Sequence, residues 1–253
     1  MTLAYDVSGT GPAVVLLHSS VCDRRMWDPQ WPDLAAAGYR VVRCDFRGHG
    51  DSPVPDGLHS DAADVAELME HLGIGRAALV GSSYGGRVAL ELAASRPEAV
   101  TALALLCSAL PGHAPGAGLR AFDEREEALF EADDLPGAVE LNVATWLGPD
   151  ATDEVREQVR AMQRRAFELQ WTAEGFPSPR PEVDLRRITV PCLAVSGGHD
   201  LPDFREMAAT IAAQAPAARH LELPWAGHLP SLERPEETTA LLTHFLKETT
   251  TPD

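Results

Sequence analysis

The chain has 253 residues, 45% of them hydrophobic, and a formal net charge of −17 at pH 7. A chain this acidic is a poor partner for nucleic acid, because binding to phosphates requires clustered Lys and Arg. The length suffices to bury the core of one domain, and no stretch approaches the ~18 uninterrupted apolar residues of a membrane span, so we expect neither nucleic acid nor a membrane as a partner.

The N-terminal part of the chain alternates between predicted strands and helices. Residues 1–6 lack the basic region and apolar core of a secretory signal, which predicts a cytoplasmic protein. Strands are predicted near 3–7, 13–18, 39–44 and 77–82, and helices near 28–37, 58–72 and 84–95. This alternation is typical of an α/β fold in which helices cover both faces of a mostly parallel twisted sheet.

The pentapeptide Gly81-Ser82-Ser83-Tyr84-Gly85 joins one predicted strand to the helix that follows it. A Gly-x-Ser-x-Gly pattern in this context is typical of a nucleophile elbow, a tight turn that raises a serine hydroxyl above the edge of the sheet. We therefore predict Ser83 as a nucleophile. The next backbone N–H, that of Tyr84, lies at the helix N-terminus and points to the same place, where it can bind an oxyanion.

The alternation stops after a predicted strand at 101–107. A segment rich in Pro and Gly leaves the sheet at 111, the sequence is then helical as far as about 175, and further prolines mark the return at 181. We therefore expect an α/β core made of residues 1–110 and 182–253, with a helical cap of residues 111–181 inserted in it. Loops at the carboxyl edge of such a sheet build its sites, so the cap should help to select the substrate.

The expected cap contains several aromatic residues: Phe122, Phe130, Trp146, Phe167 and Trp171. At helical spacing most residues of this kind pack within the protein. Trp146 differs because it ends an apolar run at a predicted helix terminus, and we predict it as a substrate contact.

Two further strands are predicted near 190–196 and 219–223, followed by helices near 203–215 and 235–247. Asp200 follows the first of these strands, and His228 lies in the loop after the second. A serine requires a base, and the base requires a partner that orients it. Ser83, Asp200 and His228 each follow a predicted strand in the order expected for one catalytic triad, so we predict His228 as the base and Asp200 as its partner.

Each of these assignments competes with a plain structural interpretation. Asp200 can also cap the helix that begins near residue 202. His199 and His113 compete with His228, but His199 is adjacent to Asp200 in the same turn and His113 lies in the Pro/Gly-rich segment. The joint order of the three predicted residues favours catalysis.

Four widely spaced cysteines complete the inventory of reactive side chains: Cys22, Cys44, Cys107 and Cys192. Three of them lie in or beside apolar strands. This placement predicts buried free thiols in a reducing compartment in preference to disulfides or a metal site.

The loop after the predicted strand 13–18 resembles the oxyanion loop of the α/β-hydrolase family. The pair His18-Ser19 stands where that family has a His-Gly pair. The resemblance implies that the backbone N–H of Ser20 is the second oxyanion donor, beside that of Tyr84. Ser19 departs from the family's glycine and restricts the backbone angles of the loop.

A second resemblance to the same family lies at residues 45–52, which match its Asp-x-Arg-Gly-x-Gly-x-Ser loop. We interpret this segment as structural, with Asp45 and Arg47 tied to each other by a charge-assisted hydrogen bond.

Within the family, the loop that ends in Met26-Trp27 and the small cap are most similar to the 3-oxoadipate enol-lactonase and cofactor-free haloperoxidase group of small esterases and lactonases. Trp27 is accordingly a second candidate for a substrate contact. The resemblance implies hydrolysis of a small carboxylic ester or lactone through an acyl-enzyme, with a small molecule as the partner and no metal or organic cofactor. A serine nucleophile argues against the haloalkane dehalogenase branch, which has an aspartate there.

Other reactions remain open, since attack by the serine is common to them all: C–C bond hydrolysis, thioester cleavage and perhydrolysis. The non-enzymatic alternative is a ligand-binding protein on the same fold. A missing triad member would favour that alternative, and none is missing. Neither the natural substrate nor the oligomeric state follows from the sequence.

Overall fold

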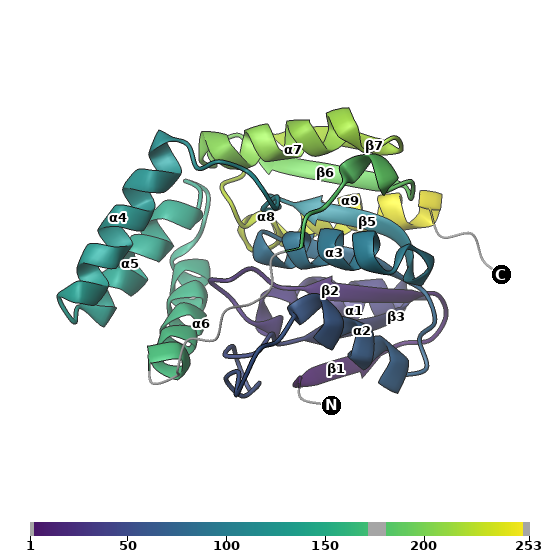
Figure 1. Cartoon of the computed structure of the whole chain (residues 1–253), viewed down its shortest axis with the longest axis horizontal. Coiled ribbons are helices and arrows are strands. Elements are labelled where there is room, and N and C mark those ends of the chain that lie inside the picture. The colour runs from purple at the N-terminus through teal and green to yellow at the C-terminus, as the bar shows by residue number, and fades with distance from the viewer. Residues whose placement is uncertain (1–2, 172–180, 250–253) are drawn as a thin grey trace.

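A computed structural model describes residues 3–171 and 181–249, which form a seven-stranded sheet with helices on both faces (Figure 1). The strand order is β1-β3-β2-β4-β5-β6-β7, in which β1 is antiparallel to β3 and all other neighbours are parallel. The strands are β1 (Tyr5–Ser8), β2 (Ala13–Leu17), β3 (Arg40–Cys44), β4 (Ala77–Ser82), β5 (Val100–Leu106), β6 (Cys192–Gly197) and β7 (Ala218–Leu223). The predicted α/β fold with a mostly parallel twisted sheet is confirmed.

The central strands are buried on both faces, which is why they read as continuous apolar runs and not as alternating ones. All six residues of β4 are buried. Along β2, Val14 and Leu16 belong to the core on one face of the sheet, whereas Val15 and Leu17 belong to the core on the other. This division follows from the two-residue period of a strand.

Outside the inserted segment, six α-helices of the described residues accompany the sheet. Helices α1 (Gln30–Ala36) and α9 (Pro235–Thr249) contribute to the core on one face, and α2 (Asp61–His71) and α3 (Tyr84–Ser95) contribute to the core on the other. Helix α7 (Pro202–Gln214) contributes to both. The short helix α8 (Pro230–Glu233) links β7 to α9, and single 3-10 turns lie at Arg24–Trp27, Pro97–Ala99 and Leu185–Arg187.

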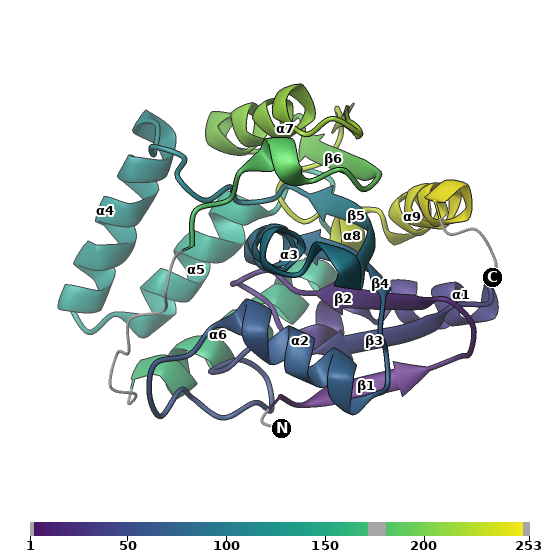
Figure 2. The same cartoon turned by 45° about the vertical axis from the view of Figure 1, so that its right-hand side comes forward.

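Of the described residues between β5 and β6 in the chain, three α-helices stand to one side of the sheet (Figures 1 and 2). These inserted helices are α4 (Ala117–Glu131), α5 (Leu135–Trp146) and α6 (Asp153–Trp171). They coincide with the segment for which the sequence predicts a cap, although most of the predicted return at 176–181 is outside the described residues. Among the helices of the described ranges, none has the length and apolar character to cross a membrane.

The loop at residues 45–52 is held differently from the prediction. Asp45 and Arg47 do not pair with each other. The carboxylate of Asp45 forms an ion pair with Arg24 and also accepts the Arg24 backbone N–H at 2.7 Å, whereas Arg47 pairs with Asp64 at 2.6 Å. Asp51 also pairs with Arg24, at 2.8 Å, and its N–H donates to Asp45 at 2.9 Å. The three charged residues of the loop therefore form their ion pairs with residues outside it.

All four cysteines are free and buried, as predicted. Burial raises the pKa of each thiol, and for Cys44 the nearby carboxylate of Asp45 adds to the shift.

Candidate active site

Ser83 lies in a strained turn between β4 and α3. Its φ of 51° and ψ of −113° place a residue with a side chain in the left-handed half of backbone space, which is costly and is typical of functional turns. Two glycines make the turn feasible. A Cβ on Gly81 would collide with the backbone of Gly85, and a Cβ on Gly85 would collide with the carbonyl oxygens of Leu17 and His18. The elbow therefore packs directly against the end of β2.

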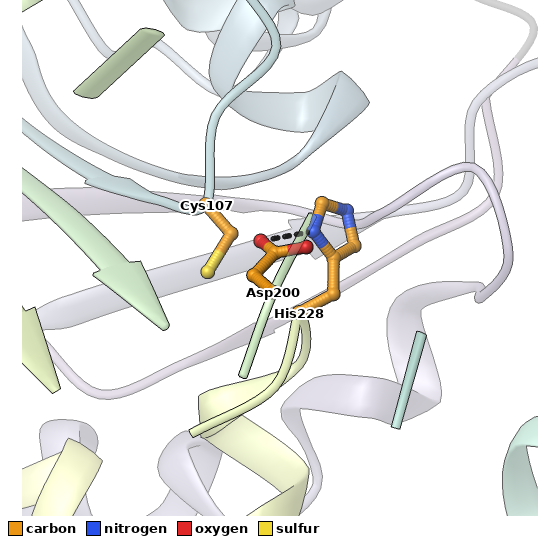
Figure 3. A group of neighbouring side chains, drawn as sticks. All are labelled: Cys107, Asp200 and His228. Atoms are coloured by element: carbon orange, nitrogen blue, oxygen red, sulfur yellow. Dashed lines mark hydrogen bonds and ion pairs between the residues drawn. The ribbon is translucent and has the colours of Figure 1, made fainter. Parts of the chain in front are cut away.

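Asp200 and His228 are joined by a short hydrogen bond. The Nδ1 atom of His228 lies 2.7 Å from Oδ2 of Asp200, and the two side chains are 3% and 0% exposed (Figure 3). With Asp200 ionised, Nδ1 carries the proton that it donates, which leaves Nε2 as the nitrogen that can accept one. The other oxygen of Asp200 accepts the backbone N–H of Leu201 at 2.7 Å. Leu201 precedes α7, and among the described residues no side-chain hydrogen bond caps that helix, so the alternative interpretation of Asp200 as a helix cap is wrong.

Cys107 is a third side chain at this pair, and the sequence reasoning did not assign it to the site. It directly follows β5, has a φ of 46°, and is fully buried. Its sulfur, a carboxylate oxygen of Asp200 and a ring nitrogen of His228 lie within 4.8 Å of one another (Figure 3). Those three atoms are a set that could hold a metal ion, but two of them are already joined to each other by the hydrogen bond. Strand order could have pointed to Cys107, because β5 lies between β4 and β6, the two strands that Ser83 and Asp200 follow.

The elbow and the Asp200–His228 pair are connected through the segment after β5. The N–H of Ser83 donates to the carbonyl of Leu106 at 2.9 Å, and the N–H of Ala109 donates to the carbonyl of Ser83 at 3.1 Å. Cys107, between these two residues, faces Asp200 and His228. The structure thus brings Asp200 and His228 into direct contact and ties Ser83 to the strand end beside them. All three residues lie at the carboxyl edge of the parallel strands.

The two predicted oxyanion donors lie on the loop after β2 and on the first residue of α3. Within the described residues, the backbone N–H groups of Ser20 and Tyr84 make no hydrogen bond to the protein. The loop of Ser20 is held by neighbouring groups instead: its carbonyl lies 3.1 Å from Nε2 of His49, and the N–H of Ser19 donates to the sulfur of Met26. Both N–H groups can therefore donate to a ligand, which is what an oxyanion hole requires of its donors.

His18 fixes the same loop through both ring nitrogens. Nδ1 lies 2.7 Å from the carbonyl of Ser19, and Nε2 accepts the N–H of Phe46 at 2.9 Å, which defines a neutral ring with the proton on Nδ1. Complete burial lowers the pKa of His18 to about 3. His18 is therefore a neutral structural link between the loop of Ser20 and the loop of residues 45–52.

The two predicted substrate contacts are both in the core. Trp146 is 6% exposed and packs against His228, Phe122 and Phe204, and its indole N–H donates to Asn142 at 2.9 Å. Trp27 has no exposed surface, and within the described residues its indole N–H has no hydrogen-bond partner. Trp146 thus contacts the predicted base, and the proposed contact of Trp27 with a substrate stays a prediction.

The two competing histidines have different surroundings from His228. His199 is exposed, and His113 pairs with Asp203 at 3.1 Å.

Comparisons with known proteins agree with the fold. A family model described as the alpha/beta hydrolase family matches residues 14–241. A Mycobacterium tuberculosis protein, provisionally named as the non-heme bromoperoxidase BpoC, is 31% identical over 260 residues, which cover 97% of this chain and 98% of the relative.

Solved structures of similar length have the same fold. A thermophilic esterase from Thermogutta terrifontis superposes with a TM-score of 0.81 at 28% identity, covering 98% of this chain and 94% of that one. The enol-lactonase from Burkholderia xenovorans LB400 superposes with a TM-score of 0.78 at 26% identity, covering 97% and 96%.

Proposed function

The chain belongs to the alpha/beta hydrolase family, and from that premise we propose that it is a serine hydrolase that cleaves a small carboxylic ester or lactone through an acyl-enzyme. The observation that carries the proposal is the buried 2.7 Å hydrogen bond between Asp200 and His228 at the sheet edge that also bears the strained elbow of Ser83. A serine hydroxyl in such a turn is activated by a base that a carboxylate orients, and the proposal assigns these two roles to His228 and Asp200.

The proposed reaction has two steps. Nε2 of His228 takes the proton of Ser83 as Oγ attacks the acyl carbon, and the N–H groups of Ser20 and Tyr84 bind the oxyanion. His228 then returns the proton to the leaving alcohol as the bond to it breaks. In the second step His228 takes a proton from water, water attacks the acyl-enzyme, and Ser83 leaves with that proton. Asp200 stabilises the imidazolium that forms in each step.

The inserted helices are proposed to act as the cap that selects the substrate. In support, α5 reaches the predicted base through Trp146, and Gln170 of α6 donates to the carbonyl of Gly48 at 3.2 Å. We further propose a small molecule as the partner and the cytoplasm as the location, where four free buried thiols would persist.

Perhydrolysis is the second candidate, because the relative from Mycobacterium tuberculosis carries a bromoperoxidase name. It would use the same acyl-enzyme, with hydrogen peroxide in place of water as the attacking group.

A substrate panel tests both candidates. Short-chain p-nitrophenyl esters, lactones and thioesters, and acetate with hydrogen peroxide, are assayed with the wild type and with Ser83→Ala, His228→Ala and Asp200→Asn. Loss of Ser83 or His228 should lower kcat by ~10⁴-fold or more, and Asp200→Asn by about as much or less. Retention of more than about a tenth of the activity by Ser83→Ala would refute the nucleophile assignment, since triad members act as a unit.

A further inference from the structure

The loop that carries His228 is held by a buried carboxylate from α8. Glu233 is 6% exposed, and its two oxygens accept different backbone N–H groups. Oε2 accepts from Gly227 at 2.8 Å, and Oε1 accepts from Leu229 at 3.1 Å. The residues on both sides of His228 are therefore fixed to one side chain.

The same loop crosses the end of α5. The N–H of His228 itself donates to the carbonyl of Trp146 at 3.0 Å. The crossing is tight, since a Cβ on Gly148 would collide with the Glu233 carboxylate and a Cβ on Gly227 would collide with the backbone of Gly148. Three consecutive backbone N–H groups, 227 to 229, thus each have one defined acceptor.

The carboxyl group of Glu233 is both buried and titratable. Burial raises the pKa of Glu233, while the N–H groups of Gly227 and Leu229 that donate to it oppose that shift. Asp200 and Cys107 are titratable groups at the ring of His228, from the loops after β6 and β5.

We propose that Glu233 is a positioning residue for catalysis: it holds the backbone of residues 227–229 so that the imidazole of His228 faces Asp200 in one orientation. This inference rests on the proposed function, in which His228 is the base. It also gives the inserted helices a role beyond selecting a substrate, because the carbonyl of Trp146, at the end of α5, accepts the N–H of His228 in the same loop.

The test compares Glu233→Gln and Glu233→Asp with the wild type. The side chain of Gln has one oxygen and one NH₂ group, so it can accept from the N–H of Gly227 or of Leu229 but presents a donor to the other. Asp keeps both accepting oxygens on a side chain that is one methylene shorter. Turnover of p-nitrophenyl acetate gives kcat and KM, and phenylmethylsulfonyl fluoride, which sulfonylates an activated serine, gives a rate that does not depend on the natural substrate. A misplaced base should lower kcat and the sulfonylation rate by about 10- to 100-fold in Glu233→Gln with KM nearly unchanged, and by less in Glu233→Asp.

The matched control is Glu91→Gln, which removes another buried carboxylate. Glu91 is 5% exposed on α3 and accepts from Arg87 at 2.7 Å. This variant should lose stability while keeping kcat and the sulfonylation rate. A Glu233→Gln protein that unfolds cooperatively and retains both rates within about twofold would overturn the proposal. Where only Glu233→Asp folds, its kcat decides in the same way, and loss of the fold in both variants would assign Glu233 to the fold alone.

A readout that needs no turnover separates this inference from the proposed function. The low-field proton resonance of His228 Nδ1–H reports its bond to Asp200 directly. It should shift or broaden in Glu233→Gln and stay unchanged in Glu91→Gln. If the wild type shows this resonance but is never sulfonylated at Ser83, the proposed function is contradicted and the inference about Glu233 is not. If the resonance is unchanged in Glu233→Gln, the inference about Glu233 is contradicted and the proposed function is not.

Discussion

Trp146 contacts His228 in two ways. The indole and imidazole ring centroids are 4.6 Å apart, and the carbonyl of Trp146 accepts the backbone N–H of His228 at 3.0 Å. The ring centroid of Phe204, on α7, is 4.2 Å from that of the same imidazole, and the Phe204 ring also contacts the indole ring. The end of α5 is therefore part of the support of the predicted base.

Replacement of Trp146 should accordingly affect all substrates alike. Trp146→Ala removes a buried ring and should cost ~3–5 kcal/mol of stability, with a lower kcat for short and long esters in similar proportion. Trp146→Phe keeps an aromatic ring against His228 and should retain most of kcat. The measurement is kcat/KM for two acyl chain lengths together with the melting temperature, and Trp171→Ala, at a residue that is 46% exposed, is the control.

A changed ratio between the two chain lengths would instead support the original prediction that Trp146 contacts the substrate. A hydrophobic pocket that loses a side chain alters such ratios by ~1–3 kcal/mol.

The strands and the elbow were predictable because their signals are local. A buried parallel strand is a short apolar run, and the turn of Ser83 requires glycines at fixed spacing, so both features can be read without knowing the partners. The order of Asp200 and His228 after their strands was equally readable.

The partners of charged side chains were not predictable in the same way. Asp45 and Arg47 are two residues apart, yet their ion pairs are with Arg24 and Asp64, which only the folded chain brings near. Cys107 was missed for the same reason, because only the folded chain brings it beside the loop of His228. Glu233 follows His228 by only a few residues, but nothing in that spacing shows that its carboxylate accepts the backbone N–H groups of the loop.

The close approach of the elbow to β2 gives a stability prediction. Gly85→Ala should be strongly destabilising, since its Cβ has no room against the carbonyl oxygens of Leu17 and His18, and overpacking of a rigid site costs about 1–3 kcal/mol or more. Gly75→Ala is the matched control, because a Cβ there meets nothing within 4 Å. Urea unfolding of the two variants checks this difference, and equal free energies of unfolding would contradict it.

His18 should make the fold sensitive to acid. Its pKa is about 3 in the folded protein and 6.5 in the reference state, so between these values the unfolded chain binds the proton that the folded protein excludes. The free energy of unfolding should therefore fall as pH drops below about 6.5, by up to roughly 1.4 kcal/mol per pH unit from this residue. The effect is absent above that pH.

His18→Gln isolates this contribution, since the amide oxygen of Gln can still accept the N–H of Phe46 but does not titrate. Urea unfolding at pH 7, 6 and 5 should give a shallower loss of stability in the variant than in the wild type. Parallel curves would show that His18 does not drive the acid sensitivity.

Alkylation of the four buried thiols can report local opening of the folded protein. Only a thiolate reacts with iodoacetamide, and a thiol that is buried with a raised pKa reacts only when its surroundings open. Cys44 ends β3, Cys192 begins β6, Cys107 follows β5, and Cys22 lies in the loop after β2. The order in which the four sites become alkylated would show whether the catalytic edge of the sheet loosens before the rest of it.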